Sequence, residues 1–331
     1  MVDAPATAFS PPRTPDPGPR LLRLSVTDRC NLRCRYCMPA AGVASVPHDE
    51  LPTLEELADA VAWLAGRCGV DRVKLTGGEP LVRKGVVGLV RALSTLPGVR
   101  EVSLTTNGTG LPALARSFAE AGLARVNVSL DTLDADCFAA LTRGGDVAEV
   151  VAGIDAALAA PLRPVKLNAV LRASAWRDDV PALLDFAAER GLEIRFIELM
   201  RTGTEVAWAL REFVSAAWVK GLLEAEGRLR PLPAPVSAPA RRTLATWRGR
   251  EVVVGWITPV SHAFCDACDR LRLDARGRLR RCLMDPVALP LVDLLRAGDE
   301  AGALAGVARY LEGKRAPGAM DSGAPMIAIG G

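Results

Sequence analysis

The run Leu21-Leu22-Arg23-Leu24-Ser25-Val26, followed after a short gap by Cys30-Asn31-Leu32-Arg33-Cys34-Arg35-Tyr36-Cys37, decides how this chain folds and what it can hold. The first run is short and mostly apolar, and it predicts a buried strand bounded by polar residues. The second run places three cysteines in a C-x3-C-x2-C pattern just beyond the end of that strand. The two runs together predict a strand that is followed directly by a metal-binding loop.

The alternation of strand and helix continues through the first two thirds of the chain. Apolar runs predict six strands, at residues 21–26, 72–75, 99–105, 125–130, 165–171 and 193–199. Helical patterns lie between them, at residues 53–67, 84–95, 111–121, 134–159 and 179–190. Such alternation predicts a parallel sheet, either a partial β/α barrel or a doubly wound sheet.

The positions of the polar and glycine-rich segments favour the barrel. Such segments follow successive predicted strands, and they read Thr76-Gly77-Gly78-Glu79-Pro80, Thr105-Thr106-Asn107, Ser129-Leu130-Asp131 and Glu198-Leu199-Met200. Barrel enzymes build their active sites at the carboxyl ends of many strands. A doubly wound fold concentrates function at one switch point. We therefore predict an α/β fold, a partial (β/α)6 TIM barrel. Three further cysteines, Cys265, Cys268 and Cys282, lie beyond it and predict a smaller C-terminal α+β domain that carries a second iron–sulfur cluster.

The predicted organisation has three parts. Residues 1–20 are rich in proline and are expected to form a disordered tail. Residues 21–230 are assigned to the barrel, and residues 231–331 to a C-terminal domain for the substrate and the auxiliary cluster. Within that last part, residues 247–250 and 274–277 have the pattern of hairpin turns, and two short helices follow.

Bulk properties exclude several classes of protein. A formal net charge of +3 gives no general affinity for nucleic acid. The chain shows neither a secretory signal nor an apolar stretch long enough for a membrane span, so we expect a soluble cytoplasmic protein. His48 and His262 are the only histidines, which excludes a Ser-His-Asp hydrolase and an HExxH metalloenzyme.

The cysteines form two triads. The second is Cys265-Asp266-Ala267-Cys268 with Cys282, a C-x2-C-x13-C pattern. Three thiolates can hold a cubane of four irons and leave one iron open, whereas a structural zinc site closes with four ligands. Both triads therefore predict open clusters, with a fortuitous zinc knuckle as the alternative. Cys68 and Cys137 lie in helical patterns and are predicted to be buried small hydrophobes.

The first triad, with Tyr36 before its last cysteine and Gly77-Gly78-Glu79-Pro80 after the next strand, resembles the cluster loop of the radical S-adenosylmethionine (SAM) enzymes. The second triad, with Phe264 before it, Arg270 and Arg272 within it and a terminal Gly330-Gly331, is similar to the GTP 3′,8-cyclase family. That family opens molybdenum cofactor biosynthesis. The resemblance extends over residues 21–331.

The resemblance implies a lyase with SAM and two [4Fe–4S] clusters as cofactors. A 5′-deoxyadenosyl radical would abstract the C3′ hydrogen of GTP, and the C3′ radical would attack C8 to give (8S)-3′,8-cyclo-7,8-dihydroguanosine 5′-triphosphate. The implied cluster ligands are Cys30, Cys34, Cys37, Cys265, Cys268 and Cys282. The implied SAM contacts are Tyr36, Gly78, Ser129 and Met200. The implied GTP contacts are Arg23, Lys74, Thr105, Lys166, Arg270 and Arg272, and the implied catalytic residues are Arg270, Arg272, Gly330 and Gly331.

A physical argument supports scattered basic residues as the nucleotide site. The chain has no G-x4-G-K-[ST] loop, so a triphosphate has to be held by separate cations and hydroxyls. Arginine forks bind phosphate through paired hydrogen bonds, and we expect these candidates to converge on one mouth of the barrel. Lys74 stands where the family more often has arginine, which keeps the charge and loses the planar fork.

The resemblance also implies functional partners. These are cyclic pyranopterin monophosphate synthase, which would take the product, and a reductant such as flavodoxin or ferredoxin. A homodimer is kept as an alternative to a monomer. Two rival functions are kept. Another radical SAM enzyme with an auxiliary cluster, such as a peptide-modifying maturase, would change only the substrate. A zinc-stabilised protein that binds nucleic acid is the other rival, and the near-neutral charge and missing fourth ligands count against it.

Overall fold

The computed structural model describes residues 20–200, 205–226, 229–233, 237–312, 314 and 326. Most of the predicted N-terminal tail, together with Gly330 and Gly331, lies outside these residues. Within the described part of the chain, no helix has the length and apolar character needed to cross a membrane.

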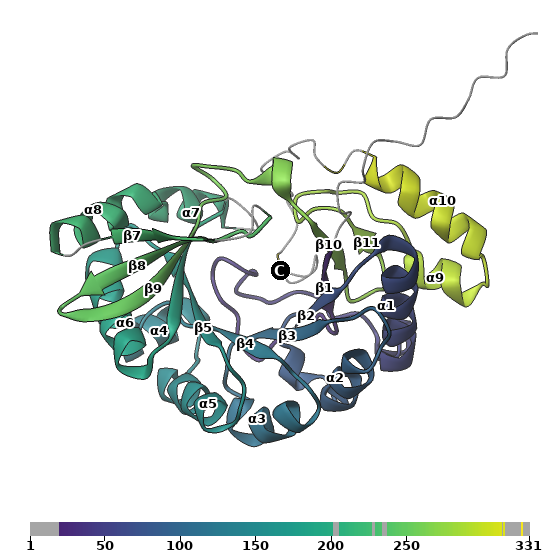
Figure 1. Ribbon diagram of the computed structural model, residues 1–331, viewed down its shortest axis with the longest axis horizontal. Helices are drawn as coiled ribbons and strands as arrows, with labels where there is room; N and C mark the ends of the chain where they lie inside the picture. The colour runs from purple at the N-terminus through teal and green to yellow at the C-terminus, as the bar shows by residue number, and fades with distance from the viewer. Residues whose placement is uncertain are drawn as a thin grey trace, which may run out of the picture.

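Six parallel strands stand side by side in the order of the sequence and form the wall of an open barrel (Figure 1). A doubly wound sheet would reverse its strand order at a switch point, and this sheet does not. The partial barrel predicted from the sequence is therefore confirmed. The strands are β1 (Leu21–Ser25), β2 (Arg72–Thr76), β3 (Glu101–Thr106), β4 (Arg125–Ser129), β5 (Val165–Leu171) and β6 (Glu193–Glu198).

Helices cover the outer face of this wall. They are α1 (Leu54–Cys68), α2 (Val86–Ser94), α3 (Leu111–Glu120), α4 (Ala135–Thr142), α5 (Val147–Ala159) and α6 (Trp176–Arg190). The single helix predicted over residues 134–159 is wrong, because the structure has α4 and α5 there. The helix ends where Arg143 and Gly144 have φ values of 58° and 114°, a left-handed backbone that no α-helix continues through.

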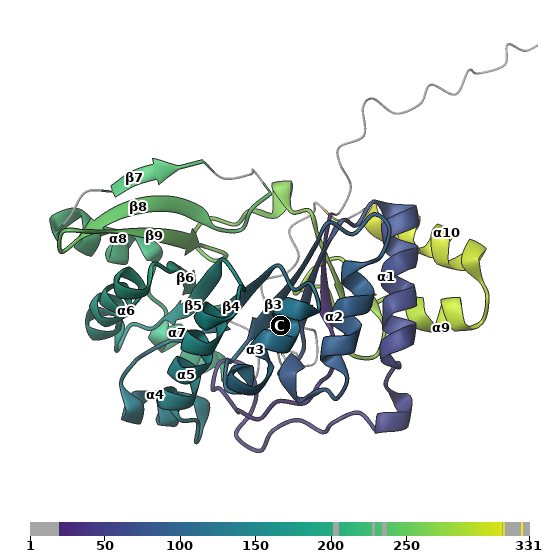
Figure 2. The ribbon, with the colours of Figure 1, turned by 60° about the horizontal axis from the view of Figure 1, so that its bottom comes forward.

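The C-terminal third of the chain extends the same sheet at both of its ends (Figures 1 and 2). One end is β9 (Arg250–Ile257), which pairs in parallel with β6, and the other is β10 (Arg270–Leu273), which pairs in parallel with β1. The remaining elements are α7 (Val206–Glu212), α8 (Ala216–Glu226), β7 (Leu229–Leu232), β8 (Arg241–Trp247), β11 (Leu279–Arg280), α9 (Leu291–Arg296) and α10 (Glu300–Leu311), with 3-10 turns at η1 (His48–Glu50), η2 (Pro80–Val82) and η3 (Cys265–Ala267).

Both predicted hairpins are present, and their turns explain their sequences. Arg248 and Gly249 connect β8 to β9 with φ values of 46° and 80°, the positive values that a tight two-residue hairpin requires. Gly277, with φ 73°, closes the turn between β10 and β11. This second hairpin carries the second cysteine triad on its open end.

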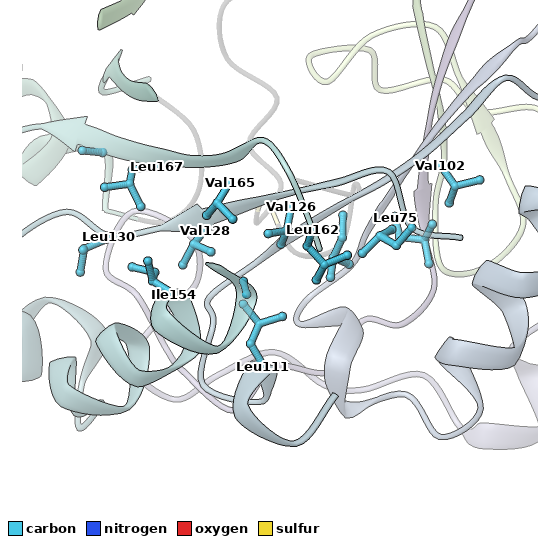
Figure 3. Packing of buried hydrophobic residues seen from close by; sticks show 14 of the residues in the cluster. Leu75, Val102, Leu111, Val126, Val128, Leu130, Ile154, Leu162, Val165 and Leu167 are labelled. Atoms are coloured by element: carbon cyan, nitrogen blue, oxygen red, sulfur yellow. The ribbon is translucent and has the colours of Figure 1, made fainter. Parts of the chain in front are cut away.

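The hydrophobic core lies between the strands and the outer helices. Figure 3 shows Val126 and Val128 of β4 facing Leu111 and Ile154 of the covering helices. Residues that alternate with these in the strands face the other way, into the lumen of the barrel. In β1, for example, Leu22 and Leu24 belong to the core, so Arg23 lies on the lumen side. The apolar side chains of the strands therefore pack against the helices, and the polar side chains line the lumen.

The packing of α5 against the loop after β3 gives a test of this fold. A methyl group added at Gly153 would lie 2.1 Å from the carbonyl oxygen of Gly108, so Gly153→Ala forces the helix away from the sheet. We expect a loss of about 1–3 kcal/mol in the free energy of unfolding. Gly66→Ala in α1 is the control, because its methyl group meets nothing within 4 Å and helix propensity alone should stabilise the protein by about 0.5–1 kcal/mol. Equal urea midpoints for the two variants would contradict the packing.

Candidate active site

The first cysteine loop begins where β1 ends and runs beside the end of α4. The backbone amides of Arg33 and Arg35 donate to the carbonyl oxygens of Thr142 and Leu141, at 3.0 and 3.1 Å. Cys30, like the other two cysteines of the loop, is half-buried. These contacts hold the loop against the barrel at the carboxyl ends of the strands.

A carboxylate from a distant segment fixes the same loop. The Nε and Nη2 atoms of Arg35 donate to one oxygen of Glu205, at 3.1 and 3.0 Å. Arg143 binds the other oxygen of Glu205 and also donates to the carbonyl oxygen of Met38 at 3.0 Å. The guanidinium of Arg35 stacks over the Trp208 ring, 4.7 Å from its centre. The loop is therefore held on two sides.

Tyr36 connects the loop to the end of β4. Its hydroxyl donates to Asp131 Oδ2 at 2.7 Å, and Asp131 Oδ1 accepts from the amide of Val170 at 2.7 Å. Burial, followed by the charge of Asp131, raises the pKa of Tyr36 well above its usual value, so the hydroxyl remains a donor. The sequence marked Ser129-Leu130-Asp131 as a strand end but gave no function to Asp131.

The glycine-rich segment after β2 lies directly against the loop after β1. The amides of Gly78 and Glu79 donate to the carbonyl oxygens of Thr27 and Arg29, both at 2.8 Å. A methyl group at Gly77 would lie 2.7 Å from the carbonyl oxygen of Thr27, so this approach requires glycine. Two strand ends are thereby joined through their backbones.

Glu79 joins a third strand end to these two. Its buried carboxylate accepts from the Thr106 hydroxyl at 2.6 Å, the Asn107 amide at 2.7 Å and the Leu81 amide at 3.0 Å. The side chain of Asn107 then donates to Asn31 in the cysteine loop at 2.8 Å. Sequence reasoning quoted Glu79 within its motif and missed this bracing function, which depends on contacts far apart in the chain.

The four residues predicted to contact SAM all lie at this carboxyl edge of the barrel. Tyr36 is in the cysteine loop, Gly78 follows β2, Ser129 ends β4, and Met200 follows β6. The C-terminal tail also returns here, because the amide of Met326 donates to the carbonyl oxygen of Cys37 at 3.1 Å.

The second triad lies at the opposite mouth of the barrel. Cys265 and Cys268 come immediately before β10, which runs parallel to β1, so they lie at the amino ends of the strands. The antiparallel β11 brings Cys282 back to the same end. Sequence reasoning placed all the nucleotide contacts at one mouth. The structure corrects this, because the strands carry the basic residues along the lumen between the two triads.

The donor sets suit iron–sulfur clusters. Backbone amides of Leu32 and Met284 donate to the sulfurs of Cys30 and Cys282, both at 3.4 Å. Burial raises the pKa of Cys30 to about 11, so thiolates in that loop need a cationic partner, which cluster irons supply. Burial by itself would raise the pKa of Cys268. The charges of Arg270 and Lys314 have the opposite and larger effect, so the pKa of Cys268 lies below its usual value.

The two cysteines outside the triads, Cys68 and Cys137, are not fully buried. None of the eight cysteines forms a disulfide. Cys68 is half-buried against the core and Cys137 is exposed at the start of α4, so the prediction that both are buried holds only in part for Cys68 and is wrong for Cys137. The helical pattern could not show which side of a short helix faces the core. Within the described ranges, no three His, Cys, Asp or Glu side chains come close enough to hold a single metal ion.

A row of basic side chains crosses the lumen, in which Lys74 is buried and Arg23 and Arg272 are half-buried. Arg272 of β10 pairs in register with Arg23 of β1, and Arg23 pairs with Lys74 of β2. Burial, followed by the charge of Arg270, lowers the pKa of Arg23 to about 10. Burial, followed by neighbouring arginines, lowers the pKa of Lys74 and of Arg272 well below their usual values. Like charges held so closely in a buried space favour an anionic ligand.

Two more predicted substrate contacts lie further along the sheet, on β3 and β5. Thr105 of β3 is in register with Asn127, and its hydroxyl has no hydrogen-bond partner among the described residues. Lys166 of β5 is ion-paired with Glu193, at 2.8 Å. Glu193 also binds Arg195 at 2.8 Å. Sequence reasoning missed Glu193 and Arg195, although their alternation along β6 is the pattern that puts two charges into one lumen.

The fold and the first cysteine loop define a radical SAM enzyme, and comparison with known proteins agrees. Residues 24–187 match the family model described as "Radical SAM superfamily", and residues 192–319 match "Molybdenum Cofactor Synthesis C". The crystal structure of Streptococcus suis SuiB bound to S-adenosylmethionine is similar in fold, with a TM-score of 0.59 and 13% identity, covering 88% of this chain and 68% of that one. At this identity the likeness concerns the fold alone.

Sequence relatives are much more similar. The GTP 3′,8-cyclase of Moorella thermoacetica is 48% identical, covering 91% of this chain and 93% of that protein. GTP 3′,8-cyclase 2 of Mycobacterium bovis is 45% identical over 94% of this chain and 89% of its own length. The chain therefore belongs to the GTP 3′,8-cyclase family, whose cofactors are SAM and two [4Fe–4S] clusters.

The counter-charge in the lumen gives a prediction. Glu193→Gln leaves Lys166, Arg195 and Arg242, which approach Glu193 within 3.2 Å or less, without their common anion. We expect the free energy of unfolding of the nucleotide-free protein to fall by about 3 kcal/mol, because buried cations are then uncompensated. Added GTP should raise the free energy of unfolding of this variant by more than it raises that of the unaltered protein.

The matched control is Glu189→Gln, which removes the same charge from an exposed carboxylate of α6. Exposed ion pairs contribute about 0–1 kcal/mol, so its thermal unfolding should hardly change. Equal effects of the two substitutions would contradict the buried electrostatic cluster.

Proposed function

We propose that this chain catalyses the reaction for which its relatives are named, the cyclisation of GTP between C3′ and C8 in the first step of molybdenum cofactor biosynthesis. The observation that carries the proposal is the row Arg272, Arg23 and Lys74, in register across three paired strands. A triphosphate would relieve the repulsion among these cations, and two of the three have the fork that binds phosphate oxygens in pairs.

Each mouth of the barrel would hold one of the two clusters. Cys30, Cys34 and Cys37 would hold one cluster at the carboxyl mouth, and Cys265, Cys268 and Cys282 the other at the amino mouth. When bound, the first cluster and SAM supply the 5′-deoxyadenosyl radical that removes the C3′ hydrogen. A substrate that reaches from one mouth toward the other has its ribose and its base held at separate ends.

The residues of this chain bind and orient. Tyr36, Gly78, Ser129 and Met200 lie where SAM would be held at the carboxyl mouth. Along the lumen, Thr105 and Lys166 would add a hydroxyl and a cation to the nucleotide site, and Lys166 would share its charge with Glu193. Positioning of this kind accelerates a reaction without any group of the protein entering it.

Arg270 and Arg272 are the proposed catalytic residues, because β10 begins beside the second triad with Arg270 and carries Arg272 into the lumen. Arg270 stacks over the Phe264 ring, 4.8 Å from its centre, which fixes its guanidinium beside the triad. Gly330 and Gly331, proposed for the same function by resemblance, lie outside the described residues.

The proposal extends to location and partners. A cytoplasmic enzyme of this kind would receive electrons from a flavodoxin or ferredoxin and pass its product to cyclic pyranopterin monophosphate synthase. Family membership is the ground on which these partners are proposed, with a homodimer as the alternative to a monomer.

An anaerobic turnover assay tests the proposal. Protein with reconstituted clusters is given SAM, a reductant and GTP, and the products are identified by mass spectrometry. We expect 5′-deoxyadenosine to form in step with an isomer of GTP. Formation of 5′-deoxyadenosine at a rate indifferent to GTP would refute the substrate and retain the radical SAM chemistry.

In the same assay, Arg272→Ala should abolish most GTP-dependent product while slow SAM cleavage by dithionite continues, because the lumen loses a phosphate-binding fork and the first triad is untouched. A loss of at least about tenfold corresponds to one charge-assisted contact of 1.4 kcal/mol or more. The control is Arg276→Ala, an exposed residue in the turn of the same hairpin. If Arg272→Ala loses both the GTP-dependent product and the slow SAM cleavage, the residue stabilises the fold and does not bind the substrate.

A further inference from the structure

Lys314, just beyond the end of α10, reaches the second cysteine triad. Its Nζ atom donates to the sulfur of Cys268 at 3.8 Å and to the carbonyl oxygen of Arg281 at 2.8 Å. It also donates to the carbonyl oxygen of Arg270. An ammonium group has three N–H donors, and each of them has an acceptor here. No motif in the sequence singled this lysine out.

The three acceptors come from both arms of the hairpin that carries the triad. Arg270 begins β10, just after Cys268, and Arg281 follows β11, just before Cys282. A single side chain therefore sets the spacing between the two arms at the point where their cysteines lie. If Lys314 were shortened, two carbonyl groups and one sulfur would lose their common donor.

Helix α10 supports this arrangement through a second contact. The hydroxyl of Tyr310 accepts from the amide of Arg281 at 3.2 Å and donates to the carbonyl oxygen of Val287 at 2.7 Å. The guanidinium of Arg281 donates to the carbonyl oxygen of Tyr310 at 3.2 Å and to Asp285 at 2.5 Å. The segment that carries Lys314 is thus docked on the hairpin, and its ammonium group is held in place.

The charge of Lys314 has an effect of its own. A hydrogen bond from a cation to a ligand sulfur stabilises the more electron-rich, reduced form of an iron–sulfur cluster, and hydrogen bonds to sulfur are among the factors that set its potential. The half-buried position of the ammonium group keeps water from screening this effect fully.

We propose that Lys314 is a positioning residue of the second cluster, which fixes the separation of Cys268 and Cys282 and raises the reduction potential of the cluster that they hold. The inference rests on the part of the proposed function that places a cluster at this triad. It does not depend on which substrate the cluster faces.

The test compares Lys314→Met and Lys314→Arg in the reconstituted holoprotein. The methionine variant keeps the length of the side chain and loses the charge, and the arginine variant keeps both the charge and the donors. Redox titration followed by electron paramagnetic resonance, with SAM present to separate the signal of the first cluster, gives the potential of the second. Lys84→Met, which removes an exposed lysine, is the control.

We expect Lys314→Met to lower the potential of the second cluster by about 59 mV, a tenfold change in the equilibrium constant of a one-electron couple. Lys314→Arg and Lys84→Met should keep the original value. Loss of the second cluster from the methionine variant alone, seen as the iron content of one cluster per chain, would support the positioning function.

Two results would overturn the inference by itself. They are a full iron content with an unshifted potential in Lys314→Met, and equal loss of the second cluster from the methionine and arginine variants. An unaltered protein that binds only one cluster would overturn the proposed function as well, so the two failures are distinguishable.

Discussion

The burial of like charges in one lumen is the constraint on which the rest of this structure depends. Arg272, Arg23 and Lys74 occupy equivalent positions on three adjacent strands, and each alternates with leucine or valine side chains that face the outer helices. The apolar face provides the free energy that keeps the strands together, and the register brings the charges side by side. A protein that holds cations in this way is poised to bind a polyanion.

The same constraint explains why the C-terminal region is part of the barrel wall. Arg272 can join the row only because β10 pairs in parallel with β1. That pairing also sets the two triads at opposite mouths, with the cations between them. At the other end of the sheet, the buried Glu198 accepts from the amide of Ala216 at 3.1 Å and the hydroxyl of Ser261 at 2.6 Å, and so ties the end of β6 to the segment before the second triad.

Local patterns in the sequence predicted much of this structure, and the failures have physical causes. Alternation such as Leu22-Arg23-Leu24 predicted strands, and the six strands lie where expected. The same alternation recurs in Arg270-Leu271-Arg272-Leu273, but nothing local says that this strand pairs with β1. Pairing partners are set by the global packing, so the extension of the sheet and the opposite placement of the triads were out of reach.

The candidate site likewise contains residues that were predicted from the sequence and residues that were missed. Both triads were found from spacing and residue type, and the basic residues from the resemblance to a known family. The carboxylates that hold the site together, Glu79, Asp131 and Glu193, were missed as a group, since their partners lie on other strands. The break between α4 and α5 could have been predicted from Gly144-Gly145, which was read through as helix.

The most direct test of the central claim is an anaerobic calorimetric titration of the reconstituted protein with GTP, GDP and guanosine at two salt concentrations. If the cation row binds the triphosphate, affinity falls with each phosphate removed, and the affinity for GTP decreases as salt rises. Guanosine that binds as tightly as GTP, with no dependence on salt, would contradict this account and assign the lumen cations to the stability of the barrel alone.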